Sequence, residues 1–137
     1  MVDCERMTLT ALTPNLMVED VGETIEWYER VFDAETTGTL PRRNGGGLRW
    51  AQVTIDDVSL RFLRRDSWGY SPLKDAELGG SLTFDIDATG IDGLHDRLQR
   101  TEAEVVQELR DTDYGRREFG VRDYNGYVLW FGEMLTR

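Results

Sequence analysis

The segment 114–133, with the sequence YGRREFGVRDYNGYVLWFGE, constrains the fold more than any other part of the chain. Residues 116–122 and 127–132 are rich in aromatic and β-branched side chains, which favour strands. Between these two runs lies the pair Asn125-Gly126, which tolerates the positive φ angles of a tight turn. The segment therefore predicts a β-hairpin that closes the fold.

The composition is that of one folded domain covering residues 1–137. Of the 137 residues, 39% are apolar and 31% are charged, which is typical of globular chains and not of disordered ones. The formal net charge of −10 argues against nucleic acid or an anionic membrane as a partner. No apolar run reaches the roughly 20 residues that cross a bilayer, and the first residues, MVDCER, lack the layout of a signal peptide. We therefore expect a cytoplasmic protein whose single cysteine, Cys4, forms no internal disulfide.

The two halves of the chain repeat one order of elements. Asp20 precedes the predicted turn residue Asp56 by 36 positions (56 − 20), and Asp87 precedes Asp123 by the same interval (123 − 87). Alternating polarity predicts strands, and apolar residues three and four positions apart predict helices. In the first half these patterns predict strands at 8–18, 35–39, 49–55 and 58–63 and a helix at 21–32. In the second half they predict strands at 81–87, 105–109, 116–122 and 127–132 and a helix at 91–100.

Two stretches of the sequence resemble a known superfamily. The first is the opening LTPNLMVEDVGETIEWYERVF at 12–32, and the second is the closing hairpin, with Tyr114-Gly115, Arg117, Phe119, Val121, Asp123, Gly126 and an apolar last strand. Together they resemble the vicinal oxygen chelate superfamily, which contains glyoxalases, bleomycin-resistance proteins and extradiol dioxygenases. The resemblance implies an α+β fold in which two βαβββ modules, at about 8–65 and 81–134, form a curved mixed sheet with helices on the outer face.

The connection between the modules spans residues 66–80. Its residues Trp68, Gly69, Tyr70 and Pro72 predict an ordered loop and not a flexible tether. Two roles remain open for this loop, a lid over a ligand pocket or a strap against a partner subunit.

Period-two alternation assigns side chains to the helix-covered face of the sheet or to the opposite face, which we call the open face. In the first hairpin Ile55 is expected opposite Val58. In the second, Arg122 is expected opposite Tyr127, which places Phe119 opposite Trp130 and turns Glu118 away from the open face. Indole and phenyl rings with a few hydrogen-bonding groups are typical of small-molecule sites. The candidate ligand-binding residues on the open face are Asn15, Trp50, Gln52, Arg61, Thr83, Asp85, Phe119 and Trp130.

The resemblance also implies where a metal would be held. Catalytic members of the superfamily take His, Glu or Gln ligands from the first and last strand of each module. The corresponding positions here are Thr13, Arg61, Ser81 and Trp130, and these four side chains do not form a competent ligand set. His95, the single histidine, is expected on the surface of a helix. We therefore predict neither a metal nor another cofactor, and no catalytic residues.

The function that the resemblance implies is metal-free binding of a small organic molecule, as in bleomycin-resistance proteins, with sequestration of a drug or metabolite. Trp50, Trp130 and Phe119 would stack on a flat ligand, Arg61 would meet an anionic group and Asp85 a cationic one. Because ligands of resistance proteins lie between two subunits, a homodimer is implied. Two alternatives are a divalent-metal-dependent lyase, isomerase or dioxygenase of the same superfamily, and a protein-interaction or regulatory module without a small ligand.

Overall fold

The computed structural model describes residues 7–43, 45–68 and 75–135, and Cys4 and Tyr70 lie outside these residues. The elements of the first module are β1 (Asn15–Val18), α1 (Val21–Phe32), β2 (Glu35–Pro41), β3 (Leu48–Ile55), β4 (Val58–Arg64) and the 3₁₀ turn η1 (Arg65–Trp68). Those of the second module are β5 (Thr83–Asp87), α2 (Ile91–Gln99), β6 (Glu104–Asp111), β7 (Arg116–Arg122) and β8 (Val128–Met134). The predicted α+β fold of two βαβββ modules is confirmed.

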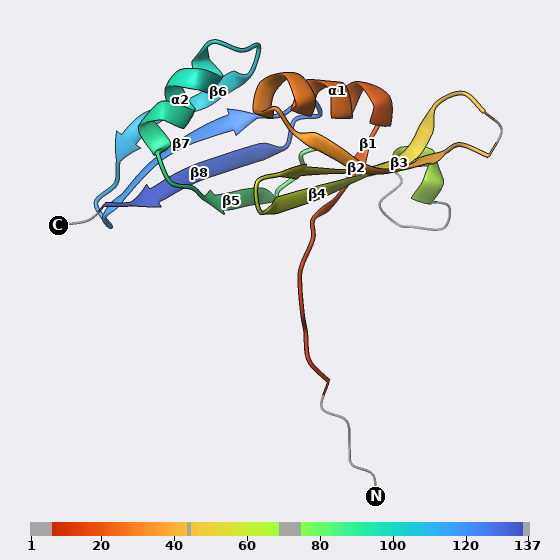
Figure 1. The fold of residues 1–137 in the computed structure, drawn as a ribbon, viewed down its shortest axis with the longest axis horizontal. Helices are drawn as coiled ribbons and strands as arrows, with labels where there is room; N and C mark the ends of the chain where they lie inside the picture. The colour runs from red at the N-terminus through yellow and green to blue at the C-terminus, as the bar shows by residue number, and fades with distance from the viewer. Residues whose placement is uncertain (1–6, 44, 69–74, 136–137) are drawn as a thin grey trace, which may run out of the picture.

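The two sheets have one topology. Their strand orders are β1-β4-β3-β2 and β5-β8-β7-β6, so each strand of the second module takes the place of the strand four earlier in the chain. In both, the first strand pairs in parallel with the last, and the other pairings are antiparallel. Both helices lie on the same side of the sheets and leave the other face open (Figure 1). Neither described helix is long and apolar enough to cross a membrane.

Helix α1 begins and ends where its sequence predicts. The Asp20 carboxylate accepts a hydrogen bond from the Glu23 amide at 2.9 Å, which satisfies one of the free N–H groups of the first turn. Asp33 ends the helix in the left-handed region at φ 58°. Helix α2 lacks a side-chain cap on its own N-cap residue, Gly90, and instead the Glu133 carboxylate of β8 accepts a hydrogen bond from the Ile91 amide at 3.0 Å.

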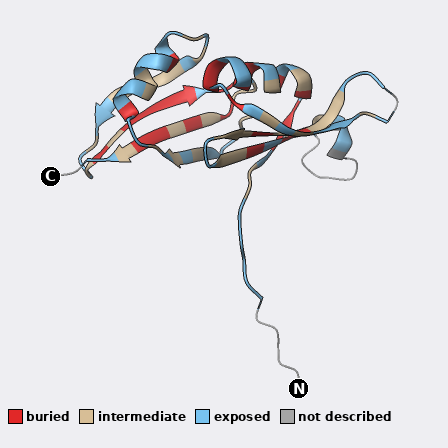
Figure 2. Ribbon diagram, viewed as in Figure 1, coloured by how far each residue is buried: buried red, intermediate tan, exposed pale blue. Residues whose placement is uncertain are grey.

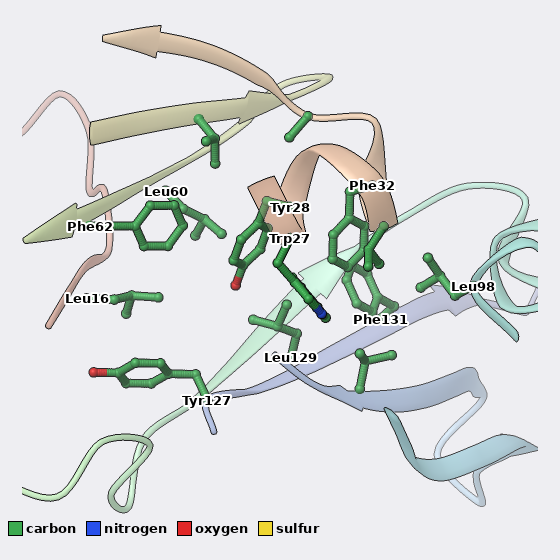
Figure 3. Packing of buried hydrophobic residues seen from close by; sticks show 14 of the residues in the cluster. Leu16, Trp27, Tyr28, Phe32, Leu60, Phe62, Leu98, Tyr127, Leu129 and Phe131 are labelled. Atoms are coloured by element: carbon green, nitrogen blue, oxygen red, sulfur yellow. The ribbon is translucent and has the colours of Figure 1, made fainter. Parts of the chain in front are cut away.

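One hydrophobic core joins the two modules, and α1 lies at its centre (Figures 2 and 3). The Tyr28 ring lies 5.1 Å from the Phe62 ring of β4, and the Phe32 ring lies 5.5 Å from the Phe131 ring of β8. Since side chains of one helix fill the space against both sheets, neither module buries its apolar face alone.

Buried hydrogen bonds fix the same junction. The Tyr28 hydroxyl donates to Asp123 Oδ2 at 2.7 Å, and the Tyr127 hydroxyl donates to the Met17 carbonyl at 2.8 Å. Burial raises the pKa of the Asp123 carboxyl above its ordinary value, while the bonds from Tyr28 and from nearby backbone amides oppose that rise. A buried acidic side chain of the second hairpin is thus tied to the first helix.

The first strand is shorter than predicted. Only Asn15–Val18 forms β1, because residues 7–14 run away from the open face as an extended arm (Figure 1). The Pro14 carbonyl accepts a hydrogen bond from the Arg61 amide at 2.9 Å, and the arm departs from the sheet beyond that point. Met7, Leu9 and Leu12 are 90%, 90% and 89% exposed.

The register predicted for the second hairpin is wrong by one residue. Arg122 pairs with Val128, not with Tyr127, so the loop holds one residue more than expected. The Asp123 side chain stabilises this longer loop, because its Oδ1 accepts hydrogen bonds from the amides of Asn125 and Tyr127 at 2.9 and 2.8 Å. A shift of one residue in one strand exchanges its two faces relative to its partner.

The observed register of β7 and β8 corrects the positions that were predicted for Phe119 and Glu118. Phe119 is fully buried on the helix-covered side, where its ring stacks on Phe131 at 5.4 Å. His95 is not a free surface residue either, since its ring lies edge-on to Phe119 at 5.0 Å. Phe119 therefore cannot line the open face with Trp130, and Glu118 takes a place on that face instead.

Candidate functional site

The first module presents a polar open face with one indole. The predicted register of β3 and β4 is confirmed, with Trp50 opposite Leu63 and Gln52 opposite Arg61. Arg61 Nε donates to Gln52 Oε1 at 2.8 Å, and this bond holds the guanidinium group against the sheet. Asn15 of β1 lies opposite Arg61 on its other side.

Arginines also gather at the outer end of the first module. A hollow of about 490 Å³ is lined by Arg42, Arg43, Arg49, Leu63, Asp66 and Ser67. Asp66 accepts hydrogen bonds from Arg42 at 3.1 Å and from Arg64 at 3.3 Å, so one carboxylate is shared by two guanidinium groups. The local charge favours an anionic group, although the chain as a whole is acidic.

The second module presents an open face with the opposite charge. Asp85 of β5 lies opposite Trp130 of β8, and Thr83 lies opposite Val128. Asp85 and Thr83 are exposed and Trp130 is half-buried. Three of the predicted site residues therefore come together here.

Each of the two indoles lies across a glycine of the neighbouring strand. A methyl group on Gly38 of β2 would come within 3.1 Å of the Trp50 ring, and one on Gly120 of β7 within 3.1 Å of the Trp130 ring. Because these glycines have no side chain, each ring can lie flat on the sheet. The opposite side of each half-buried ring is then available to a ligand.

An ion cluster that no sequence pattern predicted lies on the open face of the second module. Arg116, whose side chain is 10% exposed, donates to Asp85 and to Asp87 at 2.7 Å each. Its Nε lies 3.5 Å from the buried carboxylate of Glu118, which also accepts a hydrogen bond from the Tyr114 hydroxyl at 3.0 Å. The hydrogen bond to Asp87 and the nearby carboxylates raise the pKa of Arg116 above its ordinary value despite burial, so the guanidinium group stays charged.

This cluster also bears on the metal positions. Thr13 and Ser81 lie outside the strands, and the residues that pair with Arg61 and Trp130 of the last strands are Asn15 and Asp85. Asn15 lies opposite Arg61, and Asp85 is paired with Arg116, so a guanidinium group stands at each pair of positions. Within residues 7–43, 45–68 and 75–135, no group of three or more His, Cys, Asp or Glu side chains could hold a metal ion.

The predicted site residues form two separate groups. Asn15, Gln52 and Arg61 are neighbours in the first module, and Asp85 and Trp130 are neighbours in the second. Among the described residues, no hydrogen bond or ion pair joins the two groups. The sequence does hold a signal for Arg116 and Glu118. Asp side chains in turns commonly accept hydrogen bonds from the backbone of their own turn. Assigning that role to Asp123 would have predicted the longer loop and placed Glu118 and Arg116 on the open face with Asp85 and Trp130.

Comparison with known proteins assigns the chain to a family. The model of the glyoxalase/bleomycin resistance protein/dioxygenase superfamily matches residues 9–131. The chain belongs to this superfamily. An uncharacterized protein of Mycobacterium bovis is 30% identical over 131 residues, which cover 90% of this chain and 82% of that protein. An uncharacterized protein of Mycobacterium tuberculosis is 30% identical over 131 residues, covering 90% of this chain and 74% of its own length.

Solved structures of this superfamily share the fold. TioX from Micromonospora sp. ML1 superposes with a TM-score of 0.70 at 23% identity, covering 92% of this chain and 99% of TioX. A glyoxalase/bleomycin resistance protein/dioxygenase from Nocardioides superposes with a TM-score of 0.73 at 18% identity, and the match covers 98% of this chain and 87% of that protein. At these identities the similarity extends to the fold of the superfamily and not to a shared ligand or reaction.

Proposed function

We propose that this member of the superfamily binds a flat organic molecule on the open faces of its sheets and sequesters it without a metal ion. The observation that carries the proposal is that guanidinium groups occupy or pair with the positions from which a metal ion would be held. Arg61 lies where the first module would offer a ligand, and Arg116 is paired with the one carboxylate, Asp85, that the second module would offer. A guanidinium group has no lone pair to give a metal ion, and the ion pair with Arg116 competes with metal coordination by Asp85.

Trp50 and Trp130 supply the apolar contact in this proposal. Each ring rests on a glycine and is half-buried, so its free face can stack on a flat ligand group. Rings held against a sheet lose little further freedom on binding, which favours affinity.

The charges around the indoles suggest the polar part of the ligand. Arg61 and the neighbouring arginine-lined hollow suit an anionic or hydrogen-bond-accepting group. Asp85 and Asp87 are exposed beside Trp130 and suit a cationic group. A ligand with an aromatic body and a positive charge, such as a glycopeptide drug of the bleomycin type, fits the second module.

A homodimer is part of the proposal. The extended arm carries three nearly fully exposed apolar side chains, Met7, Leu9 and Leu12, and water-exposed apolar side chains in a row mark an interaction surface. A second copy of the chain offers a symmetric surface on which both arms could pack.

Thermal unfolding with bleomycin and with a panel of flat cationic and aromatic compounds tests the ligand. A compound at 100 times its Kd should stabilise the protein by roughly 2.7 kcal/mol. Trp50→Ala and Trp130→Ala should each raise the Kd about tenfold, since a buried aromatic contact contributes on the order of 1.4 kcal/mol. Tyr124→Ala, which removes an exposed ring from the loop between β7 and β8, should leave the Kd unchanged.

Metal analysis separates this proposal from metal-dependent chemistry. Protein purified without chelators should contain less than one tenth of a divalent ion per chain. A stoichiometric divalent ion that disappears on Asp85→Asn substitution would overturn metal-free binding and support a lyase, isomerase or dioxygenase.

A further inference from the structure

A second cavity lies on the opposite side of the sheets from the indoles. Its volume is about 530 Å³, within the range of small-molecule sites. It opens where the end of α1, the tip of the β3–β4 hairpin and the connection from β5 to α2 meet. Apolar side chains of both modules and four aspartates line it.

The floor of this cavity is apolar and comes from both modules. Phe32 and Phe131 form one wall, where their rings lie 5.5 Å apart (Figure 3). Ile55, Ile86 and Leu94 are only partly buried, so they expose apolar surface to the cavity. Apolar surface in a hollow favours an organic ligand over water.

The rim of the cavity is acidic. Asp33, Asp56, Asp57 and Asp87 line it, against the single guanidinium group of Arg97. Asp87 is paired with Arg116, whereas Asp33, Asp56 and Asp57 have no ion-pair partner among the described residues. These three carboxylates outnumber the one guanidinium group at the rim, so the rim attracts a positive charge.

The backbone holds two of these carboxylates in uncommon conformations. Asp33 and Asp56 have φ angles of 58° and 52°, and no other non-glycine residue in the described part of the chain has a positive φ. Asp33 ends α1 and Asp56 forms the β3–β4 turn, so these two elements fix where the carboxylates stand at the rim. The hydrogen bond from the Asp33 amide to the Glu29 carbonyl at 3.0 Å fixes one of them at the end of α1.

We propose that this cavity binds an organic cation with a flat or aliphatic apolar body, at a site separate from the open faces. The body would contact the Phe32–Phe131 wall, and the charge would lie between the hairpin tip at Asp56 and Asp57 and the helix end at Asp33. This inference does not depend on the proposed function, because the carboxylates that would meet the cation, Asp33, Asp56 and Asp57, take no part in the open-face site.

The test compares two ligands of nearly the same shape. N-methylacridinium carries a permanent positive charge, and acridine is neutral at pH 8. Calorimetric titration of the full chain should show that N-methylacridinium binds at least tenfold more tightly than acridine. The double variant Asp56→Asn/Asp57→Asn should raise the Kd of the cation about five- to tenfold and leave that of acridine unchanged. Asparagine suits this position because it tolerates positive φ.

Two control variants locate the binding. Glu26→Gln/Asp113→Asn also removes two exposed negative charges, at residues that do not line the cavity, and should leave the Kd of the cation within twofold of the wild type. In a Trp130→Ala background, which removes stacking on the open face, the aspartate double variant should still raise the Kd of the cation about five- to tenfold. Absence of binding to the wild type, equal binding of both ligands, or a loss caused by Trp130→Ala and not by the aspartate variant would each overturn the inference. The last result would at the same time support the open face as the binding site.

Discussion

At the scale of single residues, the hydrogen bond between Tyr28 and Asp123 links the chain's two halves. These residues are 95 positions apart, and their bond is buried. The Tyr28 hydroxyl loses water on burial, and burial together with the Asp123 carboxylate raises its pKa well above the ordinary value, so it remains a donor. A buried carboxylate is stable only if such donors surround it.

Tyr28→Phe should lower the free energy of unfolding by about 2 kcal/mol at pH 7.5, because Asp123 loses a hydrogen bond to its charged form. The same loss should raise the pKa of Asp123 further in the folded state. A folded pKa above the unfolded value means that the native state takes up the proton more readily on acidification. The deficit relative to the wild type should therefore shrink as the pH falls toward 4, as measured by urea unfolding.

A deficit of equal size at both pH values would contradict this account of the Tyr28–Asp123 bond. Tyr124→Phe is the matched control, because it removes the hydroxyl of an exposed tyrosine that contacts Glu23. Its effect on stability should stay below about 0.5 kcal/mol at either pH.

At the scale of elements, Arg116 connects three strands. It lies in β7, crosses Gly132 of β8 and reaches Asp85 and Asp87 of β5. Any side chain at Gly132 would overlap the guanidinium group of Arg116. Glycine is therefore needed here because Arg116 passes directly over it, and not because of its backbone angles. The parallel pair β5–β8 is thereby reinforced by side chains on its open face.

Gly132→Ala should displace Arg116 and break its two short ion pairs. The expected loss of stability is about 1–3 kcal/mol, because a buried guanidinium group would be left without its partners. The control is Gly93→Ala in α2, where an added methyl group meets no atom within 4 Å. That variant should be neutral or stabilise the protein by up to about 1 kcal/mol, because alanine favours helix. Similar unfolding midpoints for the two variants would show that Arg116 can leave at no cost.

At the scale of the whole molecule, the shared core makes the two modules one folding unit, and the exposed arm extends from it. Because side chains of α1 pack against both sheets, neither module has a complete hydrophobic core without the other. The arm contributes no strand of its own before Asn15. We therefore expect the arm to matter for assembly more than for the fold.

Removal of residues 2–12 should convert the proposed homodimer to a monomer in sedimentation velocity experiments, with little change in far-UV circular dichroism. The triple variant Met7→Ser/Leu9→Ser/Leu12→Ser keeps the length of the arm and should have the same effect, because the apolar contacts are lost. A truncated protein that remains dimeric, or a wild type that is monomeric at 100 times the concentration used for ligand binding, would refute this role.

The sequence by itself determined the elements whose signals are local. Asp20 caps α1, the apolar spacing at 21–32 sets its length, and the two-residue turn at Asp56-Asp57 fixes the register of β3 and β4. The repeated strand order followed from the same local patterns in both halves. These predictions held because each depends on residues a few positions apart.

Only the tertiary structure decided which face of the second hairpin carries which side chains. The loop after Arg122 is one residue longer than its Asn-Gly signal indicates, because the buried Asp123 carboxylate binds two loop amides and Tyr28 together. That single residue placed Phe119 in the core and Glu118 beside Arg116. Contacts 95 residues apart in the chain leave no local pattern, so the ion cluster on the open face and the acidic cavity between the modules emerge only from the folded arrangement.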